Sequence, residues 1–189
     1  MPFGAHETME VHEILNGKIN EINHFALYAQ QMQNTQVRQM LDRHLQSAIQ
    51  FYDQLVTYTH DYSAGQQGQQ AQGVMNVQPQ QIQYGLNNPP AQVPFMQAPF
   101  NDQQILWAML DFHKNSAKNA MAACLESADP NVRQMLLNGA NICSNHAYEV
   151  FLLLNQQGQY QVPTLSDQTA KTFLHSYQAS PSAQSFMPQ

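Results

Sequence analysis

The sequence predicts an all-α protein built as an antiparallel four-helix bundle, and three observations lead to that prediction. Apolar side chains recur at helical spacing in two blocks, residues 1–62 and 102–162. Residues 63–101, which separate the blocks, contain no Asp, Glu, Lys, Arg or His. The motif Val-Arg-Gln-Met-Leu begins at Val37 and again at Val132, 95 residues later. A chain of 189 residues fits one domain of this kind.

The first block, residues 1–62, is predicted to be a helical hairpin. Each residue of a helix turns by about 100°, so the apolar residues of the first half fall on one face. They are Val11, Leu15, Ile19, Ile22, Phe25, Ala26 and Ala29. The pattern breaks at Asn34-Thr35, and a second stripe follows: Val37, Met40, Leu41, Ala48, Phe51, Leu55 and Tyr58. Two amphipathic helices joined by a short turn are therefore expected.

Residues 63–101 are predicted to be a crossover linker. They contain five prolines, several glycines and a run of glutamines. A segment of this composition forms neither a helix nor a core of its own. Nearly forty residues are nevertheless enough to run the length of a bundle before the second block begins.

The second block, residues 102–162, is predicted to be another helical hairpin. Its first stripe contains Ile105, Met109, Phe112, Ala120 and Ala123, and its second contains Val132, Met135, Cys143, Val150 and Leu153. Between them, Asp129-Pro130 marks a turn, because proline disfavours helix in the preceding residue and suits a new first turn. The second helix should end before Gly158, and residues 163–189 are predicted to be a tail.

The repeated motif indicates that one helical hairpin has been duplicated. Two hairpins packed together make a four-helix bundle, with helices of about 25 residues and roughly 38 Å in length. A single long crossover between two hairpins is the ferritin-like connection.

Composition narrows the possible functions. Only 11% of the residues are charged, and 30 glutamines accompany 4 lysines and 3 arginines, for a net charge of −6. Nucleic-acid binding through a basic face is therefore excluded. No apolar run reaches the roughly 18 residues of a membrane span, and the start MPFGAHETMEVHE lacks the pattern of a signal peptide. We expect cytosolic synthesis and two buried cysteines, Cys124 and Cys143, rather than a disulfide framework.

Two stretches of the second block resemble the coat F domain of spore coat proteins from endospore-forming bacteria. They are AMAACLESADPNVRQML at 120–136 and GQYQVP at 158–163, and GAHETMEVHEIL at 4–15 resembles the start of longer family members. The resemblance implies a ferritin-like bundle located in the spore coat after synthesis in the mother-cell cytoplasm. Other coat proteins are the implied partners, no reaction is implied, and a homodimer through exposed apolar helix faces is compatible with this assignment.

Three histidines are predicted to face the interior of the bundle. Helical phase turns His44, His113 and His146 inward. Because His113 lies 16 residues before Asp129 and His146 lies 17 residues after it, the two should stand at the same height in an antiparallel hairpin.

A metal site is one interpretation of these histidines. Imidazole and carboxylate groups together bind iron, manganese or zinc, and the predicted set of ligands is Glu21, His113, His146 and Glu149. The alternative is that the rings are neutral and hydrogen-bonded, with no metal. The segment Glu21-Ile-Asn-His24 has the Glu-x-x-His spacing of ferritin-like sites, but His24 should point away from the apolar stripe.

The sequence favours a structural role over catalysis. It contains no nucleophile elbow, phosphate-binding loop or dinucleotide fingerprint, so we expect no enzyme. The expected function is a structural component of the spore coat, a helical module that mediates protein-protein assembly. The alternative is a ferritin-like metal-binding protein for redox chemistry or storage. Glu7 and Asp102 are expected to cap the first turns of their helices.

Overall fold

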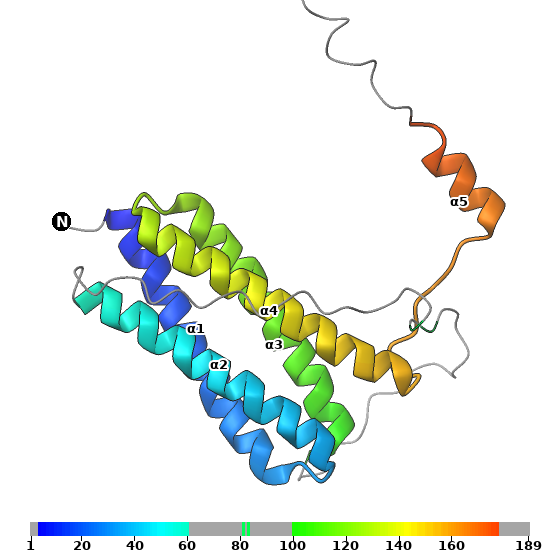
Figure 1. The fold of residues 1–189 in the computed structure, drawn as a ribbon, viewed down its shortest axis with the longest axis horizontal. Coiled ribbons are helices and arrows are strands. Elements are labelled where there is room, and N and C mark those ends of the chain that lie inside the picture. Colours follow the sequence, from blue (N-terminus) through cyan, green and yellow to red (C-terminus); the bar gives the residue numbers. More distant parts are fainter. Residues whose placement is uncertain (1–3, 61–80, 82, 84–99, 178–189) are drawn as a thin grey trace, which may run out of the picture.

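The computed structural model describes residues 4–60, 81, 83 and 100–177, and its helices confirm the predicted all-α class. Four long helices form the bundle, and a short helix lies beyond it (Figure 1). They are α1 (Ala5–Gln31), α2 (Thr35–His60), α3 (Asp102–Glu126), α4 (Pro130–Gln156) and α5 (Asp167–Leu174). Most of the predicted crossover linker, residues 63–101, lies outside the described residues.

The two hairpins lie side by side, α1 with α2 and α3 with α4 (Figure 1). They meet chiefly through α1 and α3, while α2 also touches α4. One described residue between the hairpins, Gln83, is tied to the far end of α4. The buried amide side chain of Asn155 accepts a hydrogen bond from Gln83 N and donates one to Gln83 O, at 2.8 and 2.9 Å.

Helix ends fall at the residues whose chemistry favours them. Asn101 and Gln104 form a reciprocal capping box at the start of α3. Asp129 accepts from the first backbone N–H groups of α4, whose first residue is Pro130. After α4 the chain turns through Gly158, whose φ of 70° lies in the left-handed region that glycine adopts without strain.

The turns of the two hairpins are held reciprocally by carboxylates. Asp102, in the first turn of α3, accepts hydrogen bonds from Gln33 N and Asn34 N in the α1–α2 turn, at 2.9 and 2.8 Å. Glu7, in the first turn of α1, accepts from Asp129 N in the α3–α4 turn at 2.9 Å. Each carboxylate therefore caps the turn of the opposite hairpin, whereas the sequence suggested that it would cap its own helix.

These contacts support the internal duplication. Shifted by 95 residues, Glu7 becomes Asp102 and Asn34 becomes Asp129, so the two capping contacts are equivalent. The same shift carries the end of α1 to residue 126 and the start of α2 to residue 130, which are the end of α3 and the start of α4. Glu21 and Ser116, also 95 residues apart, hydrogen-bond each other at 2.9 Å, as expected near the axis that relates the hairpins.

The interior consists of two apolar clusters separated by a polar layer. The cluster near the α1–α2 turn includes Phe25, Leu41, Met109 and Leu154 among its buried members. The cluster near the α3–α4 turn includes Val11, Leu55, Ala123 and Leu136. Between them lie buried polar side chains from all four helices, which we call the polar layer: Lys18, Glu21, His44, His113, Cys143 and His146.

The buried face of α1 is rotated by about one residue from the apolar stripe that the sequence predicted. The structure buries Glu7, Val11, Ile14, Lys18, Glu21, Phe25 and Tyr28, whereas Ile19 is 44% exposed. His24 also departs from the prediction, because its half-buried ring packs against Phe112 with centroids 5.2 Å apart. The seven apolar residues predicted for α2, by contrast, are all buried.

The predicted tail contains a helix that the sequence did not suggest. Ser166 caps α5, none of whose residues is buried, and the helix projects away from the bundle (Figure 1). Across the described part of the chain, no helix combines the length and apolarity that crossing a membrane requires.

Candidate functional site

Three imidazole rings from three helices meet at the centre of the polar layer. His44 Nδ1 and His113 Nε2 face each other at 3.0 Å. The ring of His146 stacks on that of His44, with centroids 3.8 Å apart and planes 11° apart, and meets His113 edge-on at 5.1 Å. One ring nitrogen from each histidine lies within 4.8 Å of the other two. This arrangement confirms the predicted common height of His113 and His146.

A carboxylate links the histidines to the surface. Glu149 Oε2 lies 2.8 Å from His44 Nε2, and Glu149 Oε1 accepts a hydrogen bond from Arg43. The hydrogen bond from His44, aided by the nearby Arg43 guanidinium, lowers the pKa of Glu149 against the opposing effect of its partial burial. Glu149 is therefore ionised near neutral pH and can only accept hydrogen bonds.

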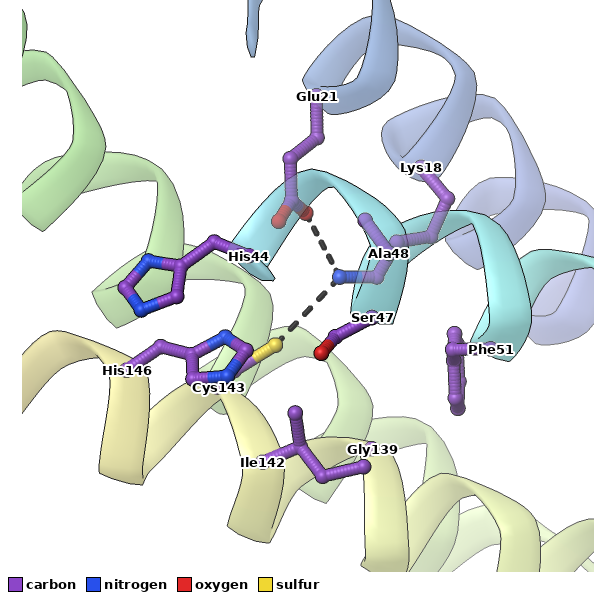
Figure 2. Close-up of a pocket in the computed structure, with 10 residues that line it drawn as sticks. All are labelled: Lys18, Glu21, His44, Ser47, Ala48, Phe51, Gly139, Ile142, Cys143 and His146. Carbon is purple, nitrogen blue, oxygen red and sulfur yellow. Dashed lines mark hydrogen bonds and ion pairs between the residues drawn. The ribbon is translucent and has the colours of Figure 1, made fainter. Parts of the chain in front are cut away.

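A second carboxylate lies on the other side of the histidines. Glu21 Oε2 accepts from Lys18 Nζ at 2.7 Å and from Ser116 Oγ at 2.9 Å. Figure 2 shows the Lys18 amino group between Glu21 and the sulfur of Cys143, which lies 3.4 Å away. Burial alone would lower the pKa of Lys18, but Cys143 and Glu21 together raise it, so Lys18 is a buried ammonium ion.

Beside these groups lies a very small cavity. Its volume is about 10 Å³, and its lining includes Lys18, Glu21, His44, Cys143 and His146 (Figure 2). A space of this size has room for about one water molecule and no organic substrate.

Burial keeps two of the imidazoles neutral. It lowers the pKa of His113 well below its ordinary value, and His44, His146 and Lys18 act in the same direction. Burial also lowers the pKa of His146, to about 3, with His44 adding to the effect. Both rings therefore present uncharged nitrogen lone pairs at physiological pH, the form of histidine that binds metals.

One nitrogen of the layer has no hydrogen bond. Among the described residues, His113 Nδ1 is the buried side-chain polar atom left without a partner. Glu21 Oε1 faces it at 3.7 Å, beyond hydrogen-bonding distance. Because His113 is neutral, this contact is not an ion pair, and the unpartnered atom calls for a physical explanation.

The structure places the four predicted ligands, Glu21, His113, His146 and Glu149, close together in the bundle, but they do not all contact one another. Glu21 and His113 adjoin each other at 1% and 0% exposure, and His146 packs against His113. Glu149 reaches the same group through His44, whose inward direction was predicted but which was not assigned as a ligand. The ligand set itself stays a prediction.

Sequence reasoning missed Lys18, Arg43 and Ser116 as members of the polar network. A signal for Lys18 was present, because a shift of 95 residues carries it onto His113, whose inward direction was predicted. A lysine in the middle of a helix is most often exposed, which explains why its position in the stripe was not recognised.

An aromatic face covers the outer surface of α3 and α4. Trp107 stacks on Tyr160, which meets Phe151 edge-on, and Phe151 stacks on Tyr148, with centroids 5.4, 5.0 and 5.7 Å apart. Lys114 Nζ lies 5.1 Å from the centre of the Tyr160 ring. A shallow groove of about 400 Å³ runs along the face, and Trp107 and Tyr148 are 40% and 39% exposed.

Residues 101–163 match the family described as Coat F domain. The match spans α3, α4 and the exit beyond Gly158, the block in which the sequence resemblance to this domain was found. Every residue of the aromatic face lies within the matched segment.

Two proteins resemble the chain over most of its length. Spore coat protein F-like protein YhcQ of Bacillus subtilis (strain 168) is 27% identical over 175 residues, which are 92% of this chain and 80% of that protein. A crystal structure of a Bacillus halodurans C-125 protein, provisionally described as a spore coat protein, has a TM-score of 0.65 at 14% identity. The likeness covers 88% of this chain and 97% of the other, and it shows a shared fold.

Proposed function

Because residues 101–163 match the Coat F domain, we propose that the protein is a structural component of the bacterial spore coat, synthesised in the mother cell. Within the coat it acts as a helical module that holds other coat proteins. The name of the Bacillus subtilis relative supports the location, and the aromatic face supports the manner of attachment.

The aromatic face carries this proposal. Trp and Tyr are the side chains that contribute most to protein interfaces, because they bury a large rigid area at little cost in side-chain entropy. Here four aromatic rings form a continuous row beside a groove, with one lysine against it. The low density of charge over the whole chain also favours association over solubility.

The polar layer supports a structural role rather than an enzymatic one. Its cavity of about 10 Å³ has no room for an organic substrate. The charged groups in the layer and beside it are also already paired, Lys18 with Glu21 and Arg43 with Glu149.

Substitution of the exposed aromatic residues tests the proposal. We expect the double variant Trp107→Ala/Tyr148→Ala to keep the helical content of the wild type and to accumulate several-fold less in the coat fraction of purified spores. The measurement is quantitative immunoblotting of coat extracts from a spore-forming host that expresses only the variant. The matched control is Ile19→Ala/Leu27→Ala, which removes similarly exposed apolar side chains from α1. Equal coat levels in the two double variants would contradict attachment through the aromatic face.

A further inference from the structure

We propose that His44, His113 and His146 form a three-imidazole site for a divalent transition-metal ion, with zinc the best fit, and that Glu149 and Glu21 are outer hydrogen-bond partners of two of the rings. The site is independent of the coat assignment, because it rests on the contacts within the polar layer.

The first argument is the direction of the hydrogen bonds. Ionised Glu149 can only accept, so His44 Nε2 carries the proton in the contact between them. His113 Nε2 lies 3.0 Å from His44 Nδ1, so this pair shares one proton. The other nitrogen of His113, Nδ1, is buried and has no hydrogen-bond partner, since Glu21 Oε1 lies 3.7 Å away.

A metal cation between His44 Nδ1 and His113 Nε2 accounts for the unpartnered atom. With both facing nitrogens bound to the cation, His113 carries its proton on Nδ1 and can donate it to Glu21. His44 keeps its donation to Glu149. Both rings then show the pattern usual for histidine ligands, in which the second ring nitrogen donates to a carboxylate.

The third imidazole favours a metal ion over a shared proton. A proton needs two nitrogens, and His44 with His113 already supplies them. His146 packs against both rings and brings a further nitrogen within 4.8 Å of the other two. Two nitrogens bound to one zinc ion lie about 3.3 Å apart, so the 3.0 Å pair opens slightly on binding. The His146 ring must also turn out of its stack on His44, because two parallel rings cannot both direct an in-plane lone pair at one ion.

The donor set selects the class of metal. Neutral nitrogen ligands suit zinc, nickel or copper, whereas magnesium, calcium and manganese prefer oxygen. The cavity of about 10 Å³ beside His44 and His146 has room for one water as a fourth ligand. Lys18 donates to Glu21 Oε2 and to Cys143 Sγ, and the Glu21 carboxylate balances its charge. This assignment differs from the set of ligands predicted from sequence. It adds His44 as a ligand, and it makes Glu21 and Glu149 hydrogen-bond partners of the ligands instead of ligands.

Zinc titration of the full-length protein tests the site. After EDTA treatment and removal of the chelator, isothermal titration with ZnCl₂ should give one zinc ion per chain and a raised Tm, because the ion binds the folded state. MgCl₂ should give no heat of binding. Absence of zinc binding at micromolar concentrations would overturn the proposal.

Variants assign the ligands. His113→Gln and His146→Gln should each weaken zinc binding by more than about 100-fold, and Glu149→Gln by about 10–100-fold, the range for an outer partner. His12→Gln, which changes an exposed histidine of α1, should bind as the wild type does. Unchanged affinity in His113→Gln would overturn the site. A loss in Glu149→Gln as large as in His113→Gln would make Glu149 a direct ligand and overturn the three-imidazole assignment.

A spectroscopic readout does not depend on the variants folding. In ¹⁵N spectra of the wild-type imidazoles, zinc should shift His44 Nδ1 and His113 Nε2 and place a proton on His113 Nδ1. Spectra that already show a protonated His113 Nδ1 and do not respond to zinc would mean that a proton completes the network, and would overturn the proposal.

Discussion

His113 and His146 stay neutral in the folded protein because burial removes the water that would stabilise their charged forms. Unfolding exposes both rings, whose ordinary pKa is near 6.5. Below that pH the two histidines are protonated in the unfolded chain but stay unprotonated in the folded chain. The two histidines therefore destabilise the fold as the pH falls from about 6.5 toward the folded-state value, which is about 3 for His146.

Replacing one ring should reduce this pH dependence. In EDTA, each buried neutral histidine should lower the free energy of unfolding by about 1.4 kcal/mol per pH unit below pH 6. The variant His146→Phe should remove one such contribution, whatever its absolute stability, and keeps a flat ring against His44. Urea denaturation at pH 6 and pH 5 measures the difference, with His12→Phe on the exposed face of α1 as the control. A slope in His146→Phe equal to that of the wild type would contradict a buried neutral imidazole.

At the scale of the helices, close packing of α2 on α4 depends on a glycine. A Cβ atom at Gly139 would lie 2.4 Å from Cε2 of Phe51, a buried residue of α2. Shifted by 95 residues, Phe51 corresponds to His146 and His44 to Gly139. The contact of Phe51 with Gly139 is therefore the counterpart of the stacked pair His44 and His146. At one contact of α2 with α4, the rings of His44 and His146 stack on each other. At the equivalent contact, the ring of Phe51 lies against the backbone of Gly139.

Two glycine substitutions should change stability in opposite directions. Gly139→Ala should destabilise the protein by about 1–2 kcal/mol, because overpacking costs about 1–3 kcal/mol and exceeds the gain in helix propensity. Gly17→Ala, in the exposed middle of α1 with no atom within 4 Å of the new Cβ, should stabilise it by about 0.5–1 kcal/mol. Urea denaturation of both variants measures the pair. If the Gly139→Ala variant were as stable as the wild type, this result would contradict the close approach of Phe51 to Gly139.

The helices also show where sequence reasoning succeeds and where it stops. The stripe of α2 was predicted because its buried residues are almost all apolar. The phase of α1 was misjudged because Lys18 and Glu21 occupy the centre of its buried face. Periodicity cannot reveal that a lysine is buried when its partners, Glu21 and Cys143, are brought to it only by folding. Helix α5 was missed because eight residues within a tail give too short a periodic signal.

At the scale of the whole molecule, the repeat explains the architecture. A hairpin duplicated at an interval of 95 residues places equivalent carboxylates at opposite ends of the bundle, where each holds the turn of the other hairpin. Sequence could predict this plan from the motif shared by residues 37–41 and 132–136, together with the heights of His113 and His146. It could not predict that His44 joins them, because ring contacts depend on how the second hairpin lies on the first.

The reciprocal caps and the shared polar layer imply that neither hairpin is independent of the other. Separating the hairpins would expose Lys18, Glu21 and His113 and leave both turns without their carboxylates. Structural units that depend on each other in this way open together rather than separately.

Native-state hydrogen exchange, measured on the full-length protein at low urea concentrations, tests this claim most directly. The most protected amides of α1 and α2 should exchange with the same opening free energy, within about 1 kcal/mol, as those of α3 and α4. Exchange of one hairpin through an opening several kcal/mol below that of the other would contradict the account of two duplicated hairpins folded around one interior.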